Sequence, residues 1–304
     1  MDNAQFIWMD GEMVPWADAQ VHALSHGLHY GTGVFEGIRA YATATGPAVF
    51  RLTEHMQRLH RSAAAYDIPV GWSVEHLVEA AREVVKVNSL PSAYIRPLVT
   101  YGAGSLSLDP GACEPVTIIA AWTWGAYLGE DGVRNGISVG VSSWRRFAES
   151  TLIPNAKGTG GYLNSVLAKR EALRAGFDEA IMLNTAGLVA EGSGENLFLV
   201  RDGVVMTPAV SAGILDGITR ASVIQLLQDD GVEVREASLV RSDLYYADEL
   251  FFTGTAAEVT PIREVDHRPV GNGRPGPITQ RAQDLFHEAV SGKLDAYLNW
   301  LEPV

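Results

Sequence analysis

The feature that most constrains the fold is a set of short apolar segments joined by tight turns. The clearest pair is formed by residues 195–200 and 204–208, with Asp202-Gly203 between them. An Asp-Gly dipeptide between two such segments is typical of a β-hairpin, because both central residues of its turn have positive φ. Residues 6–8 and 13–14 flank a similar dipeptide, Asp10-Gly11. The sequence therefore predicts antiparallel sheet in both the N-terminal and the C-terminal parts of the chain.

Helices are predicted between these strands. Apolar residues recur at helical spacing in residues 53–66, where Thr53 is the expected N-cap, and in residues 73–87. Further helices are expected at residues 162–175 and 218–228, and further strands at residues 34–41, 48–51, 93–101, 115–122, 137–141, 180–183, 250–253 and 258–263. Hairpins with intervening helices indicate an α+β fold rather than a strict βαβ repeat.

Length and a shift in composition predict two domains. A chain of 304 residues exceeds the usual size of one compact core. Residues 122–131 are rich in aromatic residues and glycine and show no clear period, so we expect an interdomain loop there that covers a site. The prediction is a small domain over residues 1–121 and a larger one over residues 132–304, each with a mostly antiparallel or mixed sheet flanked by helices.

Charge and cysteine content exclude several classes of protein. The net charge of −13 argues against nucleic acid or an anionic membrane as the main partner. Cys113 is the single cysteine, so an internal disulfide is impossible and a reducing compartment is expected. No signal-peptide pattern opens the sequence, and the longest apolar run, residues 116–122, is far shorter than the ~20 residues of a membrane span. We expect a soluble cytoplasmic protein.

Three motif-like patterns mislead. The glycines of residues 271–276 match the dinucleotide-binding fingerprint, but too few residues follow for a βαβ unit, and no acidic residue lies about 20 positions on. Residues 136–140 match a nucleophile elbow, but they continue as an alternating strand. His22, His26 and His29 bracket a loop without cysteines or paired carboxylates, so no metal site is expected.

Lys157 is the first candidate for chemistry. The chain has only four lysines among its 23 basic residues, and Lys157 lies in a glycine-rich bend before a predicted helix. Lysine, unlike arginine, can form an imine with an aldehyde and can transfer a proton once its amine is free. Most lysines are simply solvated, so the lysine alone does not decide between these interpretations.

Other residues around predicted turns could bind an anion. Gly217 precedes the predicted helix that starts near Ile218 and Thr219, where backbone N–H groups favour a phosphate. Gly254-Thr255 ends a strand in a small-residue turn with a hydroxyl, and Arg58 could reach such a phosphate from its helix. Each feature alone also fits a capped turn or a solvated side chain. Glu191 lies among small residues after an apolar strand, which suits a buried partner of a ring nitrogen.

Together these groups match the requirements of pyridoxal 5′-phosphate, namely an amine for its aldehyde, an acid for its ring nitrogen and a site for its phosphate. At this point a resemblance is plain. Over essentially its whole length the sequence resembles the branched-chain amino-acid aminotransferases of the fold-type IV pyridoxal-phosphate enzymes. The residues that carry the resemblance are Tyr30 to Arg39, His55 to Leu59, Tyr94 to Pro97, Trp124 to Tyr127, Lys157, Glu191 to Phe198, Gly217 to Arg220 and Gly254 to Glu258.

The resemblance implies a role for each residue. Lys157 would carry the cofactor, Glu191 would contact the pyridine nitrogen, and Tyr162 would bond the ring hydroxyl. The phosphate would be held by Arg58, Gly217, Ile218, Thr219, Gly254 and Thr255. The substrate pocket would be lined by Tyr30, Phe35, Gly37, Arg39, Tyr94, Arg96, Trp124, Tyr127, Thr255 and Ala256. Some of these come from a partner subunit in the family, which implies a homo-oligomer, either a dimer or a hexamer.

The implied activity is transamination between leucine, isoleucine or valine and 2-oxoglutarate, giving branched-chain 2-oxo acids and L-glutamate. A D-amino-acid or amine aminotransferase, an aminodeoxychorismate lyase, and a non-catalytic binding protein of the same fold are the alternatives. Within the implied pocket, Arg96 with Tyr30 nearby would pair the γ-carboxylate of glutamate, or else Arg96 pairs a surface acid. Gly158, Thr159 and Gly161 depart from the family pattern, and the extra glycine is expected to loosen the lysine bend.

Overall fold

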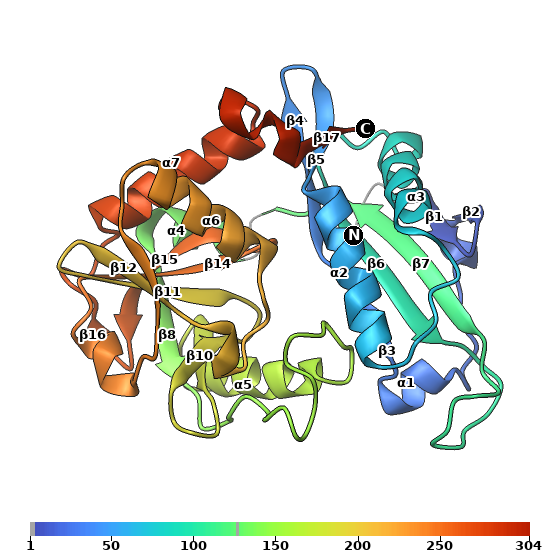
Figure 1. Ribbon diagram of the computed structural model, residues 1–304, viewed down its shortest axis with the longest axis horizontal. Helices are drawn as coiled ribbons and strands as arrows, with labels where there is room; N and C mark the ends of the chain where they lie inside the picture. Colours follow the sequence, from blue (N-terminus) through green and yellow to red (C-terminus); the bar gives the residue numbers. More distant parts are fainter. Residues whose placement is uncertain (1–3, 126–127) are drawn as a thin grey trace. The chain divides into compact units, whose positions relative to one another are not determined.

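The computed structural model describes residues 4–125 and 128–304, which fall into two compact units. The N-terminal unit comprises residues 4–124 together with residues 156–161 and 289–304. The C-terminal unit comprises residues 125–155 and 162–288, apart from residues 126 and 127. Each unit has its own sheet, shown with its helices in Figure 1.

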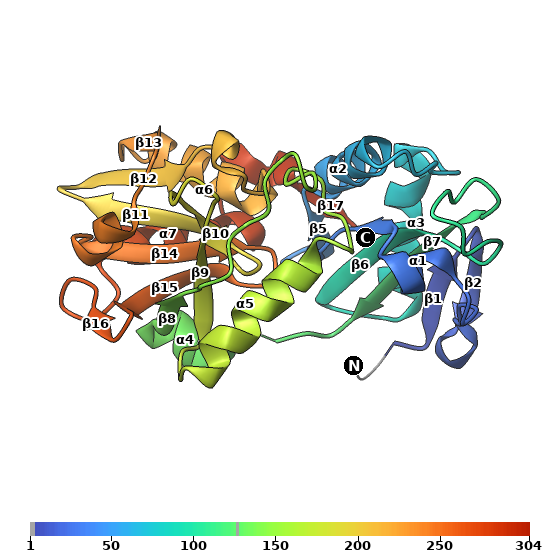
Figure 2. The same cartoon turned by 90° about the horizontal axis from the view of Figure 1, so that it is seen from below.

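The N-terminal unit is built on one antiparallel sheet with the order β17-β5-β4-β6-β7-β1-β2, in which β3 also pairs with β6. Its strands are β1 (Phe6–Met9), β2 (Glu12–Pro15), β3 (Gly33–Phe35), β4 (Ile38–Thr43), β5 (Gly46–Phe50), β6 (Ala93–Tyr101), β7 (Pro115–Trp122) and β17 (Leu301–Pro303). Its helical segments are η1 (Trp16–Asp18), α1 (His26–Tyr30), α2 (Leu52–Ala65), α3 (Val74–Val87) and η4 (Asp295–Trp300). Figures 1 and 2 show that α2 and α3 cover one face of β6 and β7. Met56, Leu59, Leu77 and Ile95 are fully buried in the core between these layers.

The C-terminal unit is built on a mixed sheet with the order β10-β9-β8-β15-β14-β11-β12-β13, to which β16 adds beside β15. Its strands are β8 (Ile137–Val141), β9 (Glu179–Leu183), β10 (Val189–Gly192), β11 (Asn196–Arg201), β12 (Val204–Pro208), β13 (Val234–Ala237), β14 (Glu249–Gly254), β15 (Glu258–Val265) and β16 (Arg268–Pro269). Its helical segments are α4 (Gly129–Asn135), α5 (Tyr162–Arg174), η2 (Val210–Ala212), α6 (Ile218–Asp229), η3 (Arg241–Tyr245) and α7 (Pro277–Val290), the last of which ends at the boundary between the units. The Phe198 and Phe251 rings stack in its core at a centroid distance of 4.9 Å.

The expected α+β architecture of two sheets flanked by helices is confirmed. Asp202 and Gly203 have φ of 50° and 76° and close the hairpin between β11 and β12 as their sequence predicts. The misleading glycine patterns lie where expected, since residues 137–141 form β8 and residues 271–276 lie in the connection before α7. In the part of the chain that the structure describes, no helix is both long and apolar enough to cross a bilayer.

Two local predictions differ from the structure, and several elements were not predicted. The strand expected over residues 34–41 is interrupted at Glu36-Gly37, between β3 and β4. Arg51, with φ of 49°, is the N-cap of α2, whereas Thr53 lies in the first turn and its hydroxyl donates to Glu302. Helices α1, α4 and α7 were not expected, and neither were strands β10, β13, β16 and β17.

The first stretch of the N-terminal unit ends at Trp124, within residues 122–131, but two later segments of the chain also belong to this unit. Residues 301–303 belong to the N-terminal unit because β17 pairs with β5, with Leu301 opposite Phe50. Residues 156–161 belong to the same unit because Gly158 forms a β-bridge with Val34. Both contacts join residues more than 100 positions apart, so local composition does not reveal them.

Candidate active site

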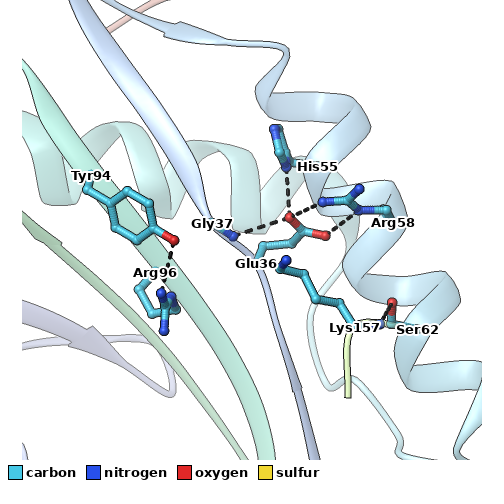
Figure 3. Close-up of polar contacts among 8 residues, drawn as sticks. All are labelled: Glu36, Gly37, His55, Arg58, Ser62, Tyr94, Arg96 and Lys157. Atoms are coloured by element: carbon cyan, nitrogen blue, oxygen red, sulfur yellow. Dashed lines mark hydrogen bonds and ion pairs between the residues drawn. The ribbon is translucent and has the colours of Figure 1, made fainter. Parts of the chain in front are cut away.

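The bend around Lys157 lies on the start of β3. The backbone N–H of Lys157 donates to Ser62 Oγ at 3.0 Å, and its carbonyl accepts from the N–H of Phe35 at 3.0 Å. The Lys157 Nζ lies 5.1 Å from the centre of the Phe35 ring. Figure 3 shows the amine directed toward the region of Glu36 and Arg58. The backbone of Lys157 is thus held on both sides, and its side chain is half-buried.

The unusual residues of this bend hold it in place. The Thr159 hydroxyl donates to the carbonyls of Gly31 and Gly33, at 2.7 and 3.1 Å. A Cβ on Gly158 would lie 2.8 Å from the Tyr66 ring, and one on Gly31 would lie 2.7 Å from Gly160. Gly158 and Gly31 therefore lie where a larger residue would not fit without a shift of its neighbours.

A buried ionic cluster lies beside Lys157. Arg58 donates through Nε to Glu36 Oε1 at 2.6 Å and through Nη2 to Oε2 at 2.8 Å, and His55 Nδ1 lies 2.8 Å from Oε2. Burial alone would raise the pKa of Glu36, but the charge of Arg58 and the hydrogen bonds from Arg58 and His55 bring it well below its usual value. Burial lowers the pKa of His55, the charge and hydrogen bond of Glu36 oppose this shift, and nearby Arg58 and Lys157 add to it, so that the pKa lies below its usual value. The cluster thus contains an ion pair and a neutral imidazole.

Tyr94 and Arg96 lie side by side on β6. Arg96 Nη2 donates to the Tyr94 hydroxyl at 2.9 Å, and the guanidinium carbon lies 4.7 Å from the centre of the Phe35 ring. The Trp124 ring meets the Tyr94 ring edge-on at 4.5 Å. Among the described residues Arg96 forms no ion pair, and its buried Nε has no hydrogen-bond partner. The Phe35 and Tyr94 rings therefore contact a guanidinium that no acid among the described residues of this unit neutralises.

The remaining pocket residues of this unit lie around the same strands. Gly37 follows Glu36, and a Cβ there would lie 2.2 Å from the Tyr94 hydroxyl. Arg39 lies opposite Tyr94 in the β4–β6 pairing. Tyr30 is 45% exposed, and its hydroxyl donates to the carbonyl of Leu106 rather than to Arg96. Tyr127 lies outside the described residues.

In the C-terminal unit, Glu191 on β10 is a buried carboxylate held on both oxygens. Arg146 Nη2 lies 2.9 Å from Glu191 Oε1. The other oxygen accepts from Asn196 Nδ2 at 3.1 Å and from the backbone N–H of Leu215 at 3.0 Å. An arginine at this distance favours the ionised carboxylate. The arrangement suits a partner that presents one N–H.

The start of α6 fits a phosphate. Its N-cap Gly217 provides no side-chain cap for the first turn, in which Ile218 and Thr219 are buried. A Cβ on Gly217 would lie 1.9 Å from Asn196 Oδ1, so only glycine fits there. Backbone N–H groups at the positive end of a 12-residue helix are a ready anion site. Gly254 ends β14, and Thr255 and Ala256 form the turn to β15.

Tyr162 is the first residue of α5 and is half-buried. The structure therefore brings Phe35, Gly37, Tyr94, Arg96 and Lys157 together in the N-terminal unit, with Arg58 beside them. Glu191, Gly217, Ile218 and Thr219 cluster in the C-terminal unit through Asn196 and Leu215. No group of three or more His, Cys, Asp or Glu side chains within residues 4–125 and 128–304 is placed to hold a metal.

Sequence reasoning assigned no role to Glu36, His55 or Arg146. Glu36 is a charged residue within the otherwise apolar or small residues 34–38, and this position could have drawn attention to it. His55 and Arg58 are three positions apart in α2, the spacing at which helical residues share a face. Nothing in the sequence distinguishes Arg146 from its neighbour Arg145.

Two buried glutamates, Glu179 and Glu195, lie in the same unit as Glu191. Glu179 on β9 accepts from Lys169 Nζ at 2.7 Å, and Glu195 lies in the turn before β11. Burial and the charge of Glu179 raise the pKa of Glu195 to about 8, with Glu191 adding to the effect and Lys169 opposing it. This raised pKa favours the protonated form of Glu195 at neutral pH.

Comparisons with known proteins agree with this geometry. Residues 33–265 match the model of the family described as amino-transferase class IV. The chain is 50% identical to a branched-chain-amino-acid aminotransferase of Escherichia coli (strain K12), over 99% of this chain and 98% of the relative. The crystal structure of the Escherichia coli branched-chain amino acid aminotransferase has a TM-score of 0.96 at 50% identity and covers 98% of this chain and 99% of that chain.

A further solved structure carries a ligand. A branched-chain amino acid aminotransferase of T.th., complexed with N-(5′-phosphopyridoxyl)-L-glutamate, has a TM-score of 0.94 at 48% identity, and the match covers 99% of this chain and 98% of that chain. Sequence and fold thus agree over nearly the whole length. The chain belongs to the class IV aminotransferase family, among the branched-chain-amino-acid aminotransferases.

Proposed function

We propose that this protein catalyses reversible transamination between branched-chain L-amino acids (leucine, isoleucine and valine) and 2-oxoglutarate, with pyridoxal 5′-phosphate as cofactor. One observation carries the proposal. The Phe35 ring lies 5.1 Å from Lys157 Nζ and 4.7 Å from the guanidinium carbon of Arg96. An apolar wall next to a reactive amine suits an aliphatic side chain, and a cation on the same wall suits a γ-carboxylate.

Two substrates with unlike side chains need such a pocket. A purely apolar pocket would reject glutamate, because an unpaired buried carboxylate is costly. Arg96 offers charged hydrogen bonds to it, and Tyr94 holds the guanidinium at the side of the wall. Leucine, isoleucine and valine instead contact Phe35 and the aromatic residues that adjoin it, with Trp124 and Tyr127 from the segment that follows β7.

The residues of the chain fit the cofactor. We assign Lys157 to its aldehyde, Glu191 to its ring nitrogen and Tyr162 to its ring hydroxyl. Its phosphate is assigned to Arg58, Ile218, Thr219 and Thr255, with Gly217 and Gly254 allowing close approach. The bound cofactor supplies an electron sink for the negative charge that develops at the substrate Cα. Lys157 would then be the base that takes the proton from the substrate Cα and delivers it to C4′ of the cofactor, and the reverse transfer would occur in the second half-reaction.

A panel of amino donors with 2-oxoglutarate tests this function. Leucine, isoleucine and valine should be used, whereas D-alanine and simple amines should not. The purified protein should be yellow, and borohydride should bleach it and leave the cofactor mass on Lys157. Lys157→Ala should lower turnover by at least about 10²-fold. Preferred use of D-amino acids or amines would indicate another member of the fold family, and a colourless protein would indicate a binding role.

The assembly proposed is a homodimer, alone or within a hexamer. Leu28, Tyr30 and Leu108 are exposed apolar residues, with Leu28 on α1 and Leu108 82% exposed in the loop after β6. This loop is tied to α1 by His26 and Tyr30, which bond the carbonyls of Ser107 and Leu106. A fixed loop with exposed leucines suits contact with a second copy, where Tyr30 would reach the partner's substrate. Leu108→Asp should shift the molar mass in solution toward the monomer, as light scattering would show.

We also place the protein in the cytoplasm. Cys113 is a buried free thiol, which suits a reducing compartment. Cell fractionation with an antibody against the protein would test this.

A further inference from the structure

Glu36 lies where β3 gives way to β4, and it is fully buried beside α2 (Figure 3). Its carboxylate accepts hydrogen bonds from Arg58 Nε and Nη2, from His55 Nδ1 and, at 3.3 Å, from the N–H of Gly37. Its own N–H donates to the carbonyl of Pro97. Backbone and side chain are thus both fixed.

Fold stability alone does not explain this residue. Removing a carboxylate from water is costly, and apolar residues of similar volume often replace both partners of a buried ion pair without loss of stability. Val34 and Ile38, two positions to either side, are apolar and fully buried. Glu36 is therefore a buried charge between two buried apolar residues of the same segment.

The geometry of the pair restricts Arg58 to one orientation. Nε and Nη2 form one edge of the planar guanidinium, and each donates to a different oxygen of Glu36. Such a two-point contact fixes the plane of the group and the direction of its opposite edge. His55, which is neutral, donates from Nδ1 to Oε2 and holds the carboxylate without adding charge.

We propose that Glu36 is a positioning residue that orients Arg58 in advance for the 5′-phosphate of the cofactor. The proposal rests on the assignment of Arg58 to that phosphate. Because the guanidinium is already ordered, cofactor binding does not have to fix its side-chain torsions. Glu36 itself touches neither cofactor nor substrate in this role.

The binding of pyridoxal 5′-phosphate, compared with the binding of pyridoxal, tests the role of Glu36. Pyridoxal has the same ring and aldehyde as pyridoxal 5′-phosphate but no phosphate, so it does not depend on Arg58. Glu36→Gln keeps the volume but replaces one acceptor oxygen with an NH₂ group that opposes the N–H groups of Arg58 or His55. Equilibrium dialysis of the loaded enzyme should show pyridoxal 5′-phosphate binding weakened about 10- to 100-fold, the range for one lost hydrogen bond to a charged group, with pyridoxal binding nearly unchanged.

Glu249→Gln is the matched control. Glu249 is also a buried glutamate, and it accepts from the N–H groups of Ile278 and Thr279 at the start of α7. Its loss should lower the melting temperature without changing the preference for pyridoxal 5′-phosphate over pyridoxal. If Glu36→Gln weakens both ligands equally, or neither, Glu36 is only structural and the proposal is wrong.

Arg58→Met separates this inference from the assignment on which it rests. If Arg58→Met leaves the preference for the phosphorylated cofactor intact, Arg58 does not bind the phosphate. If Arg58→Met removes the preference and Glu36→Gln does not, only the role of Glu36 fails. In the double variant, Glu36→Gln should add nothing to the loss caused by Arg58→Met. Should Glu36→Gln fail to fold, His55→Gln, which removes one donor to Oε2, must show a smaller loss of the same kind.

Discussion

Arg146 and Glu191 form a buried ion pair, with Arg146 Nη2 2.9 Å from Glu191 Oε1 and each side chain only 8% exposed. The backbone of Arg146 is itself fixed, since its N–H donates to the carbonyl of Leu183. Its guanidinium also lies 4.4 Å from the centre of the Phe147 ring. The carboxylate assigned to the cofactor ring is therefore oriented by a residue outside the family motifs quoted above.

Arg146→Met should destabilise the protein and lower its rate of turnover. Removing one partner of a buried pair leaves the other charge uncompensated, which costs about 3–5 kcal/mol of unfolding free energy. Turnover should fall as well, because Glu191 loses its main positional restraint. Arg145→Met is the control, since Arg145 is the adjacent arginine and is exposed. Denaturant unfolding and steady-state kinetics measure both effects, and equal results for the two variants would contradict the prediction.

Arg96→Leu should separate the two half-reactions. The variant keeps an apolar wall but removes the charged donor to the γ-carboxylate, so the half-reaction with glutamate should slow by about 10- to 100-fold. The half-reaction with leucine or isoleucine should change little. Single-turnover absorbance changes with each donor provide the measurement. An equal loss with both donors would rule out a selective role for Arg96.

Gly37→Ala should disturb the same pair of residues indirectly. The new Cβ would lie 2.2 Å from the Tyr94 hydroxyl, so Tyr94 must move and its hydrogen bond with Arg96 is lost. Overpacking of this kind costs about 1–3 kcal/mol, and KM for glutamate should rise more than KM for leucine. At Gly71 a Cβ would meet nothing within 4 Å, so Gly71→Ala is the control. Equal changes in KM for both amino acids would count against this coupling.

Glu195 should make the protein less stable in mildly alkaline solution. Its folded-state pKa of about 8, raised by burial and by Glu179, exceeds its unfolded value of about 4.3. A raised pKa contributes stability that is complete below the unfolded value and is lost as the pH rises toward 8. Glu195→Gln removes the ionisation, so the melting temperature of the holoenzyme should fall less between pH 5.5 and pH 8 than in the wild type.

Glu171→Gln is the control for that pH range. Burial would raise the pKa of Glu171, but hydrogen bonds from Ser142 and Ser143 lower it. Stability from a lowered carboxyl pKa is present above the unfolded value and is lost only in acid. In the Glu171→Gln variant, the melting temperature should therefore change between pH 5.5 and pH 8 by the same amount as in the wild type. A parallel fall in the Glu195→Gln variant and the wild type would refute the role of Glu195.

Local sequence was sufficient to predict most elements of the fold. The Asp202-Gly203 turn and the apolar periodicities of residues 53–66 and 73–87 depend on neighbours within one or two turns of chain. Such elements can be predicted without knowledge of tertiary contacts, because backbone preference and side-chain spacing act over a few residues. Lys157 in its bend and Gly217 before its helix were likewise candidates from local sequence, although neither residue alone decided its role.

The tertiary structure decided which groups meet. Glu36 joins Arg58 across 22 positions, Arg146 joins Glu191 across 45, and β17 returns to β5 across about 250. Each contact brings charge or backbone into the interior, where its energy depends on what the rest of the chain places around it. The sequence by itself determined the elements, the amine and the family. Only the folded chain set the ionisation and the orientation of the groups that would hold the cofactor, because burial and pairing over long sequence separations control both.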